Sequence, residues 1–256
     1  MKQLFQTAQF SSLILILVLN IQSISAQNYL AEYSCNSYEW AGKLHFNSKE
    51  WLYDVSFKPV VEIKISGDIM DKEIIKDDSD EKIVNKFYYR SLIKNESIDF
   101  ESMELISNLP IKDVLKQPDW MINFDTTQII GDYACHLAKG IVKGRNYSVW
   151  FAPEIPVTCG PWKLWGLPGL IINAESEDGL YKWSLISLKP SEIQPKKPQK
   201  SKTVSPENYK RGMKDAFLKF SRQIRSISEN DVEITLNSIT IANPDKELFD
   251  QETFNY

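Results

Sequence analysis

Few side chains in this sequence could act as nucleophiles, bases or soft metal ligands. There are two histidines, His45 and His136, and three cysteines, Cys35, Cys135 and Cys159. The histidines are far apart, and neither has a second histidine at the spacing of a zinc-binding helix. Cys135 and His136 are adjacent, so on a strand they point to opposite faces and cannot chelate one ion together. We therefore assign no catalytic, cofactor-binding or metal-ligating residue.

The familiar catalytic patterns are also missing from the sequence. It contains no G-x-S-x-G elbow, phosphate loop or dinucleotide fingerprint, and its carboxylates follow no order that indicates a glycosidase. The three cysteines allow one disulfide, in any of three pairings that each leave one thiol free. A bridge between Cys135 and Cys159 would close a loop of the size that contributes roughly 3 kcal/mol. Three buried thiols are the alternative, because spacing alone does not bring two β-carbons together.

Residues 160–171, GPWKLWGLPGLI, have the composition of a rigid, buried connection. Prolines fix φ, glycines permit positive φ or close approach, and two tryptophans bring large rings. Pro168 and Gly169 fit a type II turn with the glycine in the left-handed position. The stretch offers no nucleophile, general base or metal ligand, so we predict a structural role. In the alternative it forms the wall of a binding site, with Trp162 and Trp165 as contacts.

Four segments in order around this stretch resemble the GLPGLI family, which are exported bacterial proteins of unknown function. The name-giving motif is residues 166–171, and residues 130–135, 144–151 and 160–164 resemble its upstream segments, with Asp132 as an extra residue. The resemblance runs from about Trp120 to Leu188. It implies export but carries over no catalytic residue. The residues we assign to the motif or to binding are Trp150, Pro161, Trp162, Trp165, Gly166, Leu167, Pro168, Gly169, Leu170 and Ile171.

The N-terminus has the pattern of a secretory signal peptide spanning residues 1–26. Lys2 precedes an apolar core at residues 13–19, and small residues end at Ala26, where we place the cleavage. The apolar run is short for a bilayer, which needs about 20 residues. Gln27 follows the cut, whereas a lipoprotein would have a cysteine there. We predict a periplasmic or secreted protein without a transmembrane segment after cleavage.

Apolar and polar residues alternate along several segments, for example at Trp51, Tyr53, Val55 and Phe57. A period of two predicts strands. We expect a mainly β (α+β) fold, in which a curved antiparallel sheet or half-open barrel is covered by a C-terminal amphipathic helix. The sheet domain would span residues 27–188, with hairpins turning near residues 143–144 and 178–179.

Residues 189–204 are rich in lysine and proline, which is typical of a linker. Ser205 and Pro206 then suit a helix start, and apolar residues recur at three- and four-residue steps as far as Ile227. Residues 205–256 would add this helix and a final strand at 232–241 to the same domain. We expect the apolar stripe of the helix to pack on the sheet, and its basic face leaves a membrane surface as the alternative.

Charge and aromatic content narrow the function. The formal net charge of −4 argues against nucleic acid as a partner, because phosphate binding requires a basic face. Five tryptophans gather in the region that resembles the family, where we expect them to fill the core of the sheet; in the alternative they line a groove. They are Trp120, Trp150, Trp162, Trp165 and Trp183. We favour a non-catalytic envelope module without a cofactor that binds or carries an apolar ligand or a partner segment. The alternatives are an envelope hydrolase with an unrecognised site and a structural component of a cell-surface assembly.

Overall fold

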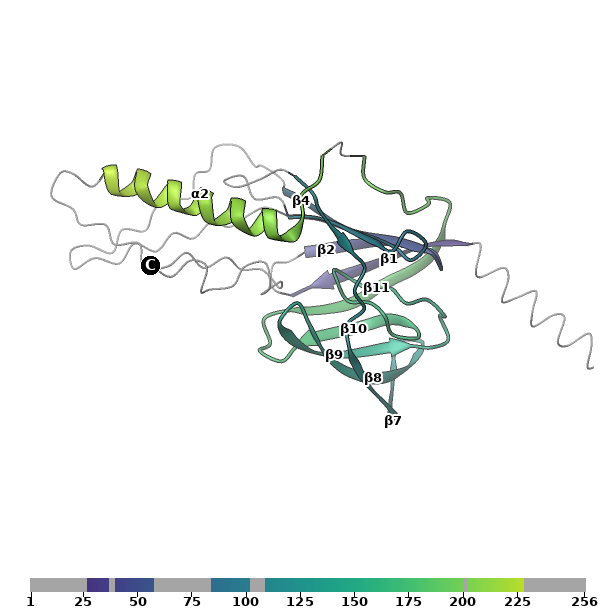
Figure 1. Ribbon diagram of the computed structural model, residues 1–256. Helices are drawn as coiled ribbons and strands as arrows, with labels where there is room; N and C mark the ends of the chain where they lie inside the picture. Colours follow the sequence, from purple (N-terminus) through teal and green to yellow (C-terminus); the bar gives the residue numbers. More distant parts are fainter. Residues whose placement is uncertain (1–26, 37–39, 58–83, 102–108, 200–201, 228–256) are drawn as a thin grey trace, which may run out of the picture.

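The computed structural model describes residues 27–36, 40–57, 84–101, 109–199 and 202–227. In this part of the chain, eleven strands form one antiparallel sheet in the order β6-β5-β4-β3-β2-β1-β11-β10-β9-β8-β7 (Figure 1). The sheet has two edges, β6 and β7, and is not closed into a barrel. Its eleven strands confirm the predicted mainly β class. The strands are β1 Asn28–Cys35, β2 Trp40–Phe46, β3 Glu50–Phe57, β4 Val84–Ser91, β5 Glu96–Phe100, β6 Ile111–Val114, β7 Trp120–Ile130, β8 Tyr133–Val142, β9 Arg145–Ala152, β10 Leu170–Ser176 and β11 Lys182–Ser191.

Local sequence explains most of the strand pairing. The hairpin of β8 and β9 turns at Lys143 and Gly144, whose φ values of 52° and 73° suit the tight two-residue turns that match the twist of a sheet. The second predicted hairpin pairs β10 with β11. In β3, Trp51 and Tyr53 are buried while the residue between them is half-exposed, as the alternation predicts.

The sheet curves around the connection between β9 and β10, residues 153–169. The ring centroid of Trp162 in this connection lies 6.5 Å from that of Tyr88 on β4, 6.1 Å from Tyr147 on β9 and 5.8 Å from Trp183 on β11. In the sheet order β4 and β9 are six strands apart, which is about 29 Å if a sheet is flat. One indole lies beside both strands because the sheet bends, and the connection therefore fills its interior.

Gly169 is required for close approach and not for a left-handed turn, so the type II turn is a wrong prediction. Its φ is not positive, and its amide donates to the main-chain oxygen of Leu167 at 2.9 Å in a three-residue turn. A Cβ at this position would overlap the main chain of Ala152. Within the connection, the residues with positive φ are Gly166 at 93° and Trp162 at 54°. Such a value in a tryptophan costs energy, and the packing around the ring maintains it.

The helix α2 spans Pro206–Ile227, the range that the sequence predicts. Tyr209 and Met213, one turn apart, are buried, and the Tyr209 hydroxyl donates to the main-chain oxygen of Glu101 at 3.2 Å. Figure 1 shows the helix extending beyond the ends of the strands, so the expected covering of the sheet is not shown. Just before α2, Val204 pairs with Ile111 of the edge strand β6.

Two predicted segments, the signal peptide at 1–26 and the final strand at 232–241, lie outside the described residues. Within the ranges that the structure does describe, no helix has both the length and the apolar character needed to cross a membrane.

Candidate functional site

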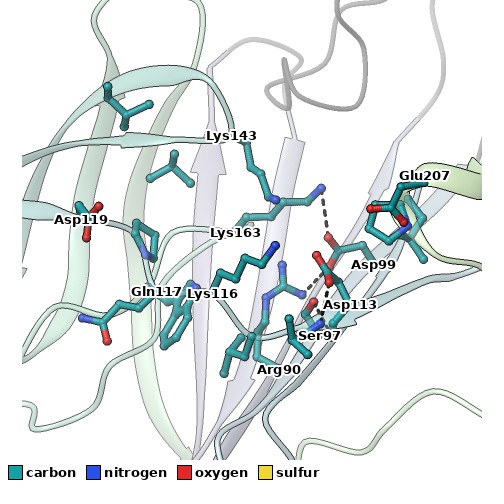
Figure 2. A pocket seen from close by; sticks show the side chains of 18 of the residues that line it. Arg90, Ser97, Asp99, Asp113, Lys116, Gln117, Asp119, Lys143, Lys163 and Glu207 are labelled. Atoms are coloured by element: carbon teal, nitrogen blue, oxygen red, sulfur yellow. Dashed lines mark hydrogen bonds and ion pairs between the residues drawn. The ribbon is translucent and has the colours of Figure 1, made fainter. Parts of the chain in front are cut away.

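A cavity of about 440 Å³ lies between the edge strand β6 with its neighbours and the end of β8 (Figure 2). One wall comes from β4, β5 and β6, and another from the end of β8. Residues 115–119, which join β6 to β7, and the first turn of α2 complete it. The residues that line it are mainly charged or polar: Arg90, Ser97, Asp99, Ile111, Asp113, Val114, Leu115, Lys116, Gln117, Pro118, Asp119, Ile141, Val142, Lys143, Lys163, Trp165, Pro206, Glu207 and Lys210.

A buried ion network lies along one side of this cavity, and three of its members, Arg90, Asp99 and Lys163, line it. Arg90 pairs with Asp99, and the Lys163 ammonium lies 3.1 Å from Asp99 Oδ2 and 3.2 Å from Glu101 Oε1. Lys86 lies 3.3 Å from the other oxygen of Glu101. All five residues are at least nine-tenths buried, with Glu101 1% exposed and Lys163 3% exposed. Buried charges of this kind persist only when they are paired, so the network holds its members in one arrangement.

Both carboxylates of the network favour the ionised form. Burial alone would raise the pKa of Asp99, but Arg90 and Lys163 outweigh it and hold that pKa below its usual range. Burial would likewise raise the pKa of Glu101, and the neighbouring Lys163 and Lys86 lower it despite the repulsion from Asp99. The wall therefore presents fixed charges of both signs at neutral pH.

Strand alternation and the strained connection together position these groups. Lys86 and Arg90 share one face of β4 with Tyr88, since residues two apart point to the same side. Lys163 follows Trp162, and its ammonium lies 5.6 Å from the Trp162 ring centroid and 5.4 Å from that of Tyr88. The positive φ of Trp162 thus directs its ring into the core and the next side chain to the ion network.

Sequence reasoning missed Lys163. The interpretation that residues 160–171 offer no nucleophile, general base or metal ligand is not contradicted, but it overlooked an ammonium that is buried against two carboxylates. A signal was present: Lys163 stands between Trp162 and Leu164 in a run of apolar residues, where burial of the neighbours also buries the lysine. Its carboxylate partners could not be predicted, because they lie more than sixty residues away in the chain.

Of the predicted motif residues, Trp165 lines the cavity. Its main-chain oxygen accepts a hydrogen bond from Trp120 Nε1 at 2.8 Å, and Gln117 Nε2 donates to the main-chain oxygen of Gly166 at 3.0 Å. The motif thus anchors the segment that closes the cavity. Most of the other predicted residues serve packing: Pro161, Trp162, Leu167, Gly169, Leu170 and Ile171 are buried, and Trp150 is half-buried. Pro168 is exposed.

The histidines and cysteines do not line the cavity. His45 lies 3.8 Å from Asp54, and the ring of His136 packs between Phe124 and Phe151. All three cysteines, Cys35, Cys135 and Cys159, are buried free thiols, so the Cys135–Cys159 bridge is not formed in this structure.

Burial, with Glu154 nearby, raises the pKa of Cys135 to about 11, and burial raises the pKa of Cys159 further. Thiols in that state are poor nucleophiles. Among the described residues, no three histidine, cysteine or carboxylate side chains gather as a metal site would require.

Part of the chain matches a known protein family. A family described as "Protein of unknown function (Porph_ging)" matches residues 139–173, which include the connection and Lys163. No curated protein matches the chain.

Two solved structures of PNGF-II are similar in part. The structure in the C2 space group has 17% identity and a TM-score of 0.48 over 75% of this chain and 33% of that chain. The structure in the P21 space group has 18% identity and a TM-score of 0.47 over 70% of this chain and 31% of that chain. The chain therefore spans about a third of the length of PNGF-II.

Proposed function

We propose that this chain is an exported binding module of the GLPGLI type, located in the periplasm or secreted, and that its site is the charged cavity. The ligand is small and polar. The observation that supports this proposal is the cavity wall of Arg90, Asp99 and Lys163, whose buried ion pairs hold polar groups in fixed positions. A volume of several hundred Å³ is typical of ligand sites. This lining is more highly charged than the usual, mainly apolar one, which is why we infer a polar ligand.

The packing of the tryptophans argues against the apolar ligand that the sequence suggested. Trp162 is 2% exposed and Trp165 is 7% exposed, and Leu164 and Leu167 between and after them are fully buried. These side chains occupy the inside of the curved sheet, where an acyl chain would have to lie. A ligand that enters the cavity instead meets charged groups, which an apolar molecule could not compensate.

Non-catalytic binding suits the wall better than hydrolysis does. Ser97 is the hydroxyl side chain on the cavity lining, and its Oγ donates to the main-chain oxygen of Asp113 at 3.4 Å. A serine nucleophile would need a base within hydrogen-bonding distance. The convergence of polar groups in one cleft is the observation that favours an envelope hydrolase, which is the second candidate.

Export and family membership rest on the sequence. The pattern of residues 1–26 supports a signal peptide. The family match at residues 139–173 supports a fold around the motif that is shared with members of that family. In this proposal the motif residues are structural, and they present Lys163 and Trp165 to the ligand.

Two kinds of probe test the proposal. A panel of amino acids, sugars, sugar acids and nucleotides is screened by thermal shift, and a fluorescent fatty acid reports on apolar binding. We expect a saturable shift with a polar compound, lost in Lys116→Glu at the cavity mouth and kept in Lys139→Glu, an exposed control outside the cavity. Saturable binding of the fatty acid, or a panel without any shift, contradicts the proposal.

A further inference from the structure

We propose that the cavity binds the phosphate group of a small hydroxylated ligand, through a cationic wall of Arg90, Lys116, Lys143 and Lys163. This inference rests on the proposed function, because it concerns the same cavity, and it adds the chemical class of the ligand.

Arg90 provides the directional contact. Its two described hydrogen bonds, to Asp99 and to the main-chain oxygen of Tyr89 at 2.9 Å, both come from Nη1. Nε and Nη2 remain as donors, and these two groups form the edge of a guanidinium that binds two oxygens of an oxyanion side by side. The side chain is 4% exposed and lines the cavity, so little conformational entropy is lost when it binds.

Three lysines from different elements surround the same space. Lys163 belongs to the β9–β10 connection, Lys143 to the β8–β9 turn and Lys116 to the segment between β6 and β7. Figure 2 shows the three side chains and Arg90 directed into the cavity, with Asp99 facing them. Cations gathered around a concave surface raise the local concentration of an anion and increase its association rate.

The lining carries five cationic side chains and four carboxylates. Four of the cations, Arg90 and the three lysines, surround one space, and this local excess favours phosphate over carboxylate. A carboxylate is satisfied by the fork of Arg90 alone, whereas a phosphate monoester carries a charge of about −1.5 to −2 at pH 7 and three acceptor oxygens. Asp99 is already held by Arg90 and Lys163, so it orients both cations. Alternating cations and carboxylates elsewhere on the lining suit hydroxyl groups, which both donate and accept hydrogen bonds.

The volume sets the size of the ligand. A cavity of about 440 Å³ exceeds the space of a phosphate ion and falls within the range of sites for small metabolites. Asp113 is a second carboxylate on the lining, beside Asp99 in Figure 2, where it can accept a hydrogen bond from a ligand hydroxyl. A sugar phosphate combines a phosphate group for the cations with hydroxyl groups for the carboxylates.

Calorimetric titration at constant ionic strength tests the inference. The probes are glucose 6-phosphate, inorganic phosphate, glucose as the uncharged match and gluconate as the carboxylate match. We expect glucose 6-phosphate to bind at least about tenfold more tightly than glucose or gluconate, since one charge-assisted hydrogen bond accounts for that factor. Lys116→Gln and Lys143→Gln should each raise its Kd about threefold to tenfold. Lys139→Gln, which removes an equal charge outside the cavity, should leave the Kd within about twofold.

Comparable binding of gluconate or glucose, lost in the cavity variants, would overturn the phosphate assignment and leave the proposed polar site intact. An equal loss in Lys139→Gln would also overturn it, because the attraction would then be general. If no probe binds and the wider panel also gives no shift, both proposals fail together.

Discussion

Replacing Lys163 with methionine tests the buried ion network that forms the cavity wall. Methionine keeps the unbranched apolar part of the side chain and removes its charged end, so Asp99 and Glu101 each lose a cation that now lies within 3.2 Å. Removing one partner of a buried ion pair costs about 3–5 kcal/mol, because the remaining charge stays desolvated. That is a large share of a typical unfolding free energy of about 5–15 kcal/mol.

The assay is urea unfolding at pH 7, with the midpoint and slope recorded for parent and variant. We expect Lys163→Met to lose about 3–5 kcal/mol, or roughly 6–20 °C of melting temperature for a domain of this size. Lys139→Met, on the exposed face of β8, should stay within about 0.5 kcal/mol. The double variant with Glu101→Gln should lose less than the two single losses together, by at least about 0.5 kcal/mol, because one unpaired charge is removed.

A loss below about 1 kcal/mol would show that Lys163 is solvated, since an exposed ion pair contributes only that much. Strict additivity in the double variant would show that Lys163 and Glu101 do not interact. Either result refutes the ion network as the element that fixes the cavity wall.

Three further predictions concern pH, the connection and export. The pKa values of Asp99 and Glu101 in the folded protein lie below their usual 3.8 and 4.5. The two ionised carboxylates therefore contribute their full stability above the usual values, and that stability is lost as the pH falls through the lower folded values. The unfolding free energy should be steady from pH 7 to 5 and should fall below about pH 4. Gly169→Val should lower the melting temperature because a Cβ overlaps the main chain of β9, whereas Gly212→Ala in open space on α2 should raise stability by up to about 1 kcal/mol; equal melting of Gly169→Val and parent would refute the close approach. Protein recovered from the envelope of expressing cells should begin at Gln27 by N-terminal sequencing, and an intact Met1 would exclude cleavage.

Local regularities were sufficient for much of the fold. Alternation predicted strand β3, and turn residues predicted the β8–β9 and β10–β11 hairpins, because these signals depend on neighbours within a few residues. The start of α2 at Pro206 followed from a capping serine and a proline, which satisfy the first turn locally. The conformation of Gly169 was not predictable in this way, because its constraint is the main chain of Ala152.

The cavity was not predictable from the sequence either, because its residues are distant in the chain and meet only in the tertiary structure. Lys163 meets Asp99 and Glu101 only because the sheet curves around residues 153–169 and places β4 and β5 beside them. No periodicity in the sequence encodes that curvature, which depends on the packing of Trp162 against three distant strands.

The sequence by itself therefore determined many of the elements: strands with clear alternation such as β3, two hairpins, the helix range and the composition of the connection, but not the edge strands β6 and β7. Only the tertiary structure decided what the connection does, since burial made a lysine in an apolar run part of a charged wall, placed Trp162 in the core and left Trp165 at the lining of the cavity. Hydrophobic alternation acts between neighbours, whereas pairing of buried charges depends on which distant groups the fold brings within about 4 Å.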